Sequence, residues 1–136
     1  PERGEGAARC MVEALEDAGL DPGDIGQVNA HGTSTQRNDL SEAFAISDVF
    51  GSRAVPVTSS KGVLGHSIGA AGALEALITM ESNRHGLVPP TANLITVDPE
   101  IDEVIDVVDE SRVVHSKIAI SNSFAFGGHN ACLVLG

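Results

Sequence analysis

Two histidines, His31 and His66, are the residues whose positions most directly suggest chemistry. Each lies where a predicted strand gives way to a predicted helix, which is where ligands bind in open α/β sheets. Two imidazoles at one edge of a sheet could donate hydrogen bonds to the same small oxygen atom and so stabilise an oxyanion or enolate. The sequence therefore predicts one half of an active site.

A lysine and a glutamate accompany the second histidine. Glu75 is the only charged residue between Ile68 and Met80, and an ionised carboxylate in such an apolar helix is costly unless it is paired. Lys61, in the loop before that helix, is the nearest partner in the sequence. We expect either a structural ion pair or a pair that also fixes the loop carrying His66.

The helix that follows His66 bears on the charge of its imidazole. We expect His66 at or near the helix N-terminus, where the macrodipole disfavours a positive charge and keeps the ring neutral. A core histidine beside a glycine-rich helix is the competing interpretation. A hydrolase using His31 with Ser34 or Ser67 is disfavoured because no carboxylate is placed to orient the histidine. The glycines do not have phosphate-loop spacing, and the five histidines do not have zinc-ligand spacing.

Composition limits the remaining possibilities. A chain of 136 residues with 42% hydrophobic content is expected to form one domain, residues 1–136, with a packed core. The net charge of -11 argues against a nucleic-acid surface, and no apolar stretch approaches the roughly 20 residues that a membrane span needs. Cys10 and Cys132 lie far apart and predict neither a disulfide framework nor a metal site, so a cytoplasmic setting fits best.

The hydrophobic periodicity predicts an α/β order of elements. Helices are expected up to Ala18, over 39–50 and, buried on all sides, over 68–80; strands are expected over 25–30, 55–58, 113–120 and 131–135. Asp39 followed by Glu42 resembles a capping box at the start of the second helix. The acidic run at 98–110 is expected to be a solvated loop. The first helix has no strand before it, as if the chain were cut from a longer one.

Four ordered motifs resemble the C-terminal half of an elongating β-ketoacyl-[acyl-carrier-protein] synthase. The resemblance covers nearly the whole chain. The motifs are Asn29-Ala30-His31-Gly32-Thr33-Ser34-Thr35; Ser60-Lys61 with Gly65-His66 and Gly69-Ala70-Ala71-Gly72; Pro89-Pro90-Thr91 with Asn93-Leu94; and Ser121-Asn122-Ser123-Phe124-Ala125-Phe126-Gly127-Gly128 with Asn130.

The resemblance implies a decarboxylative condensation. Enzymes of this family load an acyl chain onto a cysteine and join it to decarboxylated malonyl carried on an acyl carrier protein, in fatty-acid or polyketide synthesis. His31 and His66 would hold the malonyl thioester oxygen and support decarboxylation. Lys61 would be the active-site lysine, paired with Glu75.

The resemblance also implies roles for residues around these four. Thr33 and Thr35 would contact the phosphopantetheine arm, and Phe126 would be the gate between the malonyl site and the acyl pocket, with Phe124 beside it. No catalytic metal and no cofactor beyond that arm are implied. A structural cation could lie near four residues that match positions around such an ion in some relatives: Asn29, Glu75, Ser121 and Asn130.

The family nucleophile would lie outside this chain, because neither Cys10 nor Cys132 matches its position. The implied partners are the acyl carrier protein and the N-terminal half of the same enzyme, and the full-length protein would be a homodimer. The alternative is a non-catalytic ketosynthase-like subunit of the chain-length-factor type, which would pair with an active partner. Retention of both histidines and of Lys61 favours the enzyme.

The implied fold is thiolase-like, with layered helices on a mixed sheet. Each half of that fold has the order β-α-β-α-β-α-β-β and the strand order 3-2-1-4-5. Because the first predicted element is a helix, we expect the chain to lack the first and central strand of its half. We therefore expect an incomplete domain, a fragment of a longer chain.

Overall fold

A five-stranded mixed sheet organises the computed structural model, which describes residues 3–136. The central strand β1 is parallel to its neighbours β2 and β6; β4 extends the sheet beyond β2, and β7 runs antiparallel to β6 at the other edge. The strands are β1 (Gln27–Asn29), β2 (Pro56–Thr58), β4 (Asp106–Val107), β6 (Ala119–Phe124) and β7 (Asn130–Leu135). A separate antiparallel pair joins β3 (Leu87–Val88) to β5 (Arg112–Val113).

The sheet corrects the expectation of a missing strand. Counted along the chain, its strands have the order 3-2-1-4-5, and the central position is filled by β1. The expectation was wrong because β4 was not recognised. Its two residues lie inside the acidic run, where they pair with β2, and Val108 directly after them is fully buried.

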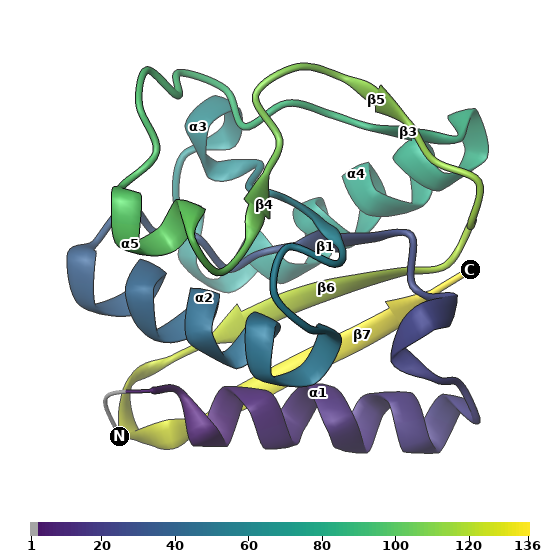
Figure 1. The fold of residues 1–136 in the computed structure, drawn as a ribbon, viewed down its shortest axis with the longest axis horizontal. Helices are drawn as coiled ribbons and strands as arrows, with labels where there is room; N and C mark the ends of the chain where they lie inside the picture. The colour runs from purple at the N-terminus through teal and green to yellow at the C-terminus, as the bar shows by residue number, and fades with distance from the viewer. Residues whose placement is uncertain (1–2) are drawn as a thin grey trace.

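Helices lie on both faces of the sheet. α1 (Glu5–Ala18) packs on β7 and on α2 (Gln36–Phe50), whereas α4 (Ala71–His85) packs on β6 from the opposite side (Figure 1). α1 buries Ala7, Met11 and Leu15, which are spaced one turn apart. It ends at Ala18, as predicted, and Gly19 follows in the left-handed conformation. The main core therefore lies between the sheet and the α1–α2 layer.

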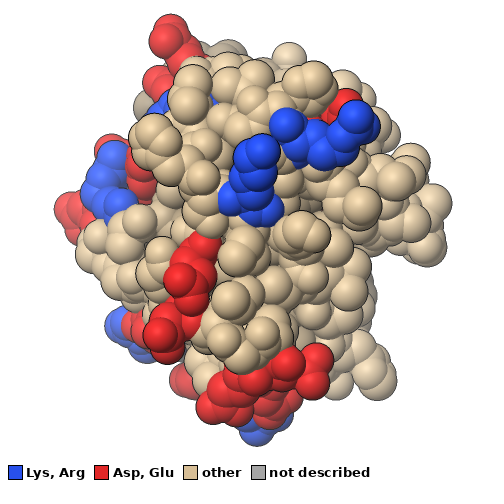
Figure 2. Space-filling model, turned by 90° about the vertical axis from the view of Figure 1, so that its right-hand side faces the viewer, with Lys and Arg blue, Asp and Glu red and all other residues tan. Residues whose placement is uncertain are grey.

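The α4 helix buries its polar side and exposes its apolar side. Glu75, Thr79 and other residues at four-residue spacing face the sheet, whereas Leu77 and Met80 are 62% and 50% exposed. The expectation that this helix is buried on all sides is therefore wrong for the described residues, since none of them covers its outer side. Figure 2 shows a broad area without charged side chains next to separate acidic and basic groups on one face of the molecule.

Short elements complete the connections between the strands. They are η1 (Pro22–Asp24), α3 (Lys61–Leu64), η2 (Ile68–Ala70), α5 (Pro99–Asp102) and η3 (Phe126–Gly128). Within residues 3–136, no helix has the length and apolar character required to cross a membrane.

Candidate active site

The two histidines come together at the carboxyl ends of neighbouring parallel strands. His31 follows β1, and His66 lies in the segment between β2 and α4. Their ring centroids are 5.6 Å apart with the ring planes at 87°, and the Phe124 ring at the end of β6 lies 6.1 Å from that of His31. The sheet thus brings three of the predicted site residues into one cluster.

His31 is a buried, neutral imidazole. Its exposed fraction is 8%, and its Nδ1 lies 3.5 Å from Lys61 Nζ. Burial, together with the nearby Lys61 and His66, lowers the pKa of His31 from 6.5 to about 4, and burial has the largest effect of the three. The ring is therefore uncharged at neutral pH. With a lysine ammonium facing Nδ1, the ring proton resides on Nε2.

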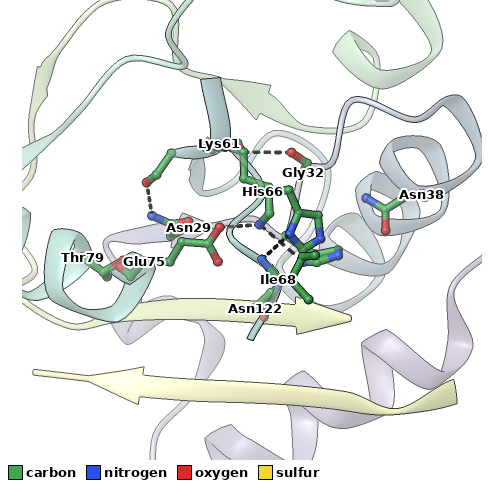
Figure 3. A network of polar contacts seen from close by, with 12 residues as sticks. Asn29, Gly32, Asn38, Lys61, His66, Ile68, Glu75, Thr79 and Asn122 are labelled. Carbon is green, nitrogen blue, oxygen red and sulfur yellow. Dashed lines mark hydrogen bonds and ion pairs between the residues drawn. The ribbon is translucent and has the colours of Figure 1, made fainter. Parts of the chain in front are cut away.

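Lys61 and Glu75 form the ion pair that the sequence predicts. Both side chains are buried, and Lys61 Nζ donates to Glu75 Oε1. Lys61 is the first residue of the short helix α3 and does not lie in a loop as predicted, and Figure 3 shows its side chain reaching toward Glu75 on α4. Since the same ammonium faces His31, the pair connects α4 to the first histidine as well as to the loop of the second.

His66 is oriented by a backbone contact two residues further on. It is exposed and lies before α4, which begins only at Ala71, so the expected helix N-terminus does not surround it. Instead, its Nδ1 accepts a hydrogen bond of 3.1 Å from the backbone N–H of Ile68. This contact leaves the ring proton on Nε2. Ile68 has a left-handed backbone with φ of 50°, which is strained for a β-branched residue.

Glu42 is a site residue that sequence reasoning missed. Its two carboxyl oxygens accept hydrogen bonds from the backbone N–H groups of His31 (2.8 Å) and Gly32 (2.9 Å), and Asn122 donates to it at 3.2 Å. Burial raises the pKa of this carboxyl, and the three hydrogen bonds oppose that shift.

The sequence predicts that Glu42 forms a capping box with Asp39 at the start of the second helix, and that interpretation is wrong. α2 begins at Gln36 with Thr35 as its N-cap, so Glu42 lies in the second turn on the buried side. The buried position of Glu42 could have been predicted from the same signal as that of Glu75, namely an acidic residue beside apolar positions of a predicted helix.

A cavity of about 510 Å³ opens beside His66. It is lined by Lys61 and His66, by Thr33 and its neighbours in the loop after β1, and by residues 91–94 and 96–98. The hydroxyls of Thr33 and Thr35 lie 2.9 Å apart in that loop. The Phe126 ring is fully exposed in η3, whereas Phe124 is half-buried against His31, so the two phenylalanines do not share one environment.

The four residues expected around a cation do not all converge. Asn29 pairs with Ser121 in the sheet, and alternation along β6 places Ser121 on the α4 side, opposite to Asn122, which contacts α1 and α2. Glu75 on α4 faces the same side. Asn130 pairs with Phe124 and its side chain lies beside Gly6 of α1, on the other face of the sheet.

Two of the residues expected around a cation have a buried oxygen without a hydrogen-bond partner among residues 3–136. These oxygens are Asn29 Oδ1 and Glu75 Oε2, and hard cations favour such amide and carboxylate oxygens. Asn130 does not belong to this group. In residues 3–136, no cluster of three or more His, Cys, Asp or Glu side chains could hold a metal ion.

Neither cysteine has the character of an activated nucleophile. Burial raises the pKa of the Cys10 thiol, and it raises that of Cys132 to about 12. Cys10 lies on α1 and Cys132 in β7, as the sequence predicts. Both thiols are therefore protonated at neutral pH, in contrast to a catalytic thiolate.

Comparison with known proteins extends these observations. Residues 1–95 match the family described as "Beta-ketoacyl synthase, C-terminal domain". The 3-oxoacyl-[acyl-carrier-protein] synthase 2 of Mycobacterium bovis is 47% identical over 134 residues, 98% of this chain and 32% of that protein. The chain thus spans about a third of the length of the curated relatives it matches.

Two solved complexes show the same fold. A ketosynthase in complex with its chain length factor from Xenorhabdus doucetiae has a TM-score of 0.90 and 34% identity, covering 98% of this chain and 34% of that one. A type II polyketide synthase acyl-carrier protein in complex with its ketosynthase has a TM-score of 0.91 and 33% identity, covering 98% and 33%. The fold is therefore the thiolase-like one that the sequence predicts, and this chain belongs to the β-ketoacyl synthase family, whose C-terminal domain it matches.

Proposed function

We propose that this chain supplies the malonyl-binding residues of a 3-oxoacyl-[acyl-carrier-protein] synthase. The observation that carries the proposal is the histidine pair, with ring centroids 5.6 Å apart and both Nδ1 atoms facing donors. Two neutral imidazoles held this way each present an Nε2–H group. Such a pair suits a single oxygen atom on which negative charge develops.

The proposed reaction uses that oxygen as an electron sink. As the malonyl C–C bond breaks, its electron pair passes into the thioester, carbon dioxide leaves, and the enolate oxygen receives hydrogen bonds from His31 and His66. The enolate carbon then attacks an acyl thioester formed on a cysteine outside this chain. The cysteine thiolate leaves as the 3-oxoacyl product forms.

Lys61 and Glu75 act on the first histidine in this proposal. The ammonium facing Nδ1 keeps the His31 proton on Nε2, and Glu75 neutralises the buried lysine charge. A positively charged neighbour also keeps His31 from taking up a proton, consistent with its pKa of about 4. In the proposal, Asn29 Oδ1 and Glu75 Oε2 would contribute ligands to a structural cation, which would take no part in the reaction.

The phosphopantetheine arm of the acyl carrier protein would enter through the cavity beside His66. In the proposal, Thr33 and Thr35 contact the phosphopantetheine arm, and Phe126 gates the passage to the acyl pocket with Phe124 beside it. The remaining part of the enzyme supplies the nucleophile. An acyl carrier protein is the partner of the ketosynthase in one similar structure, which supports it as the partner proposed here. We also propose that the full-length protein is a homodimer.

The experiment is to measure malonyl decarboxylation and cysteine acylation separately on the full-length protein. His66→Ala should lower carbon dioxide release by about 100-fold or more, the usual effect of removing one oxyanion donor, and should leave acylation largely intact. His85→Ala is the matched control, because His85 is an exposed histidine paired with Glu81 on α4. An unchanged decarboxylation rate in His66→Ala would falsify the proposal.

A non-catalytic, chain-length-factor type of subunit is the second candidate. A ketosynthase–chain length factor complex is among the similar structures, which favours it. Retention of His31, His66 and Lys61 in one cluster favours the enzyme. The upstream sequence separates the two, since an enzyme requires a cysteine at a strand-to-helix turn there and a chain-length factor does not.

A further inference from the structure

The turn formed by residues 91–94, here called the outer turn, contacts the loop that carries Lys61. Asn93 has a left-handed backbone with φ of 64°, and its Nδ2 donates a 2.8 Å hydrogen bond to the carbonyl oxygen of Gly62. Asparagine tolerates this conformation better than most residues. The backbone of the outer turn is thus shaped to present this side chain to the loop.

The carbonyl that Asn93 contacts belongs to a helix of only four residues. In and around α3, the backbone N–H groups of Val63 and Leu64 both donate to Ser60, and that of Gly65 donates to Lys61. None of these three amides therefore donates a hydrogen bond to the Gly62 carbonyl oxygen. Helix ends leave such carbonyl groups to be satisfied by side chains, which is what Asn93 does here.

The outer turn and the loop are also packed backbone to backbone. A Cβ on Gly62 would overlap the carbonyl oxygen of Ala92, so only glycine permits this approach. Thr91 adds a contact of 3.4 Å from the Ser59 N–H to its hydroxyl, and its own N–H donates to the Val108 carbonyl at 2.8 Å. Because the Val108 N–H in turn donates to the carbonyl oxygen of Val57 in β2, the outer turn connects the loop to the sheet.

We propose that Asn93 is a positioning residue for the loop of Lys61 and His66. By fixing the Gly62 carbonyl, Asn93 holds the residues on either side of it. Lys61 is thereby kept facing His31, and the chain leaves α3 in the direction that places the ring of His66 near that of His31. The outer turn lines the same cavity as these two side chains, so it also borders the space through which the substrate is proposed to enter. This inference rests on the function proposed above.

The test uses Asn93→Asp and Asn93→Gly in the full-length protein. Both variants tolerate a left-handed backbone and remove the donor, so they isolate the hydrogen bond. Two measurements are made: hydrogen exchange of the peptide covering 59–66, and kcat and KM for malonyl decarboxylation. Ser52→Ala is the matched control, since Ser52 makes an exposed hydrogen bond of 3.1 Å to Glu103 on the same long connection.

We expect exchange in 59–66 to rise about fivefold, the effect of losing one ordinary hydrogen bond, while exchange in α1 and α2 stays unchanged. We also expect kcat to fall about fivefold or more with KM retained, and Ser52→Ala to match the wild type. Unchanged exchange in 59–66 overturns the proposal. Raised exchange with normal kcat also overturns it, provided that His66→Ala abolishes decarboxylation; if His66→Ala has no effect, the proposed function itself fails, and the positioning role fails with it.

Discussion

The two histidines are held by different means, although they face each other. The loop of His31 is anchored from the core, where the buried carboxylate of Glu42 accepts hydrogen bonds from two consecutive backbone amides. The loop of His66 is exposed and is held by three separate contacts, namely the N–H of Ile68, the Lys61–Glu75 ion pair and the side chain of Asn93.

Because of this difference, we expect changes near the two histidines to have different effects: near His31 on the stability of the domain, and near His66 on the geometry of the loop. Disturbing the anchor of His31 exposes buried amides and therefore affects the whole domain. Disturbing the Ile68 or Asn93 contact near His66 changes an exposed loop and affects its geometry more than the free energy of unfolding, whereas the buried Lys61–Glu75 pair contributes to both. The following predictions test that contrast.

The largest effect is expected from Glu42→Ala. Removing this carboxylate leaves the amides of His31 and Gly32 buried without acceptors, and we expect the free energy of unfolding to fall by about 4 kcal/mol. Denaturant unfolding of the full-length protein measures the change. Glu42→Gln keeps one acceptor oxygen and should lose clearly less. Equal stability of Glu42→Ala and wild type would show that the loop is not anchored from the core.

An intermediate effect is expected from acidification, through His31. Its pKa is about 4 in the folded protein against an ordinary value of 6.5. As the pH falls from about 6.5 to about 4, the unfolded chain takes up a proton that the folded chain does not, so stability decreases by up to about 3 kcal/mol. The melting temperature of His31→Asn should therefore fall less than that of the wild type between pH 7 and pH 4.5. Parallel pH profiles would contradict the burial of a neutral His31.

The smallest effect is expected at Ile68. Its side chain is 83% exposed and its backbone is left-handed, so Ile68→Gly relieves strain and should stabilise the protein by up to about 1 kcal/mol. Ile95→Gly is the matched control, because Ile95 is 96% exposed and does not have a positive φ. Thermal unfolding compares the two. If both substitutions destabilise equally, the Ile68 backbone is not strained.

Much of the site was predictable from local sequence signals. The positions of His31 and His66 follow from the rule that ligands bind at the carboxyl ends of parallel strands, and the Lys61–Glu75 pair follows from the cost of an unpaired charge in an apolar helix. The contacts made by Glu42 and Asn93 were not predictable in this way. They join segments that are distant in the sequence, and only the folded chain shows which backbone groups need a partner.

The errors in the predicted fold have a similar origin. Strand β4 has only two residues in an acidic run, so no alternation marks it, and its pairing with β2 crosses about 50 residues of chain. The outer side of α4 was expected to be buried because Leu77 and Met80 are apolar, but burial depends on what covers a surface. Asn130 was assigned to a cation site from its motif, although the face of a sheet on which a residue lies depends on register.

In the proposed reaction, the two differently held loops deliver hydrogen-bond donors to one oxygen atom. Measuring malonyl decarboxylation by the full-length His31→Ala and His66→Ala variants side by side tests this most directly. We expect each variant to lose about 100-fold or more in rate, and the two losses to agree within about tenfold despite the different burial of the two rings. Acylation of the cysteine should continue in both. A variant of either histidine that decarboxylates malonyl at the wild-type rate would contradict the shared oxygen.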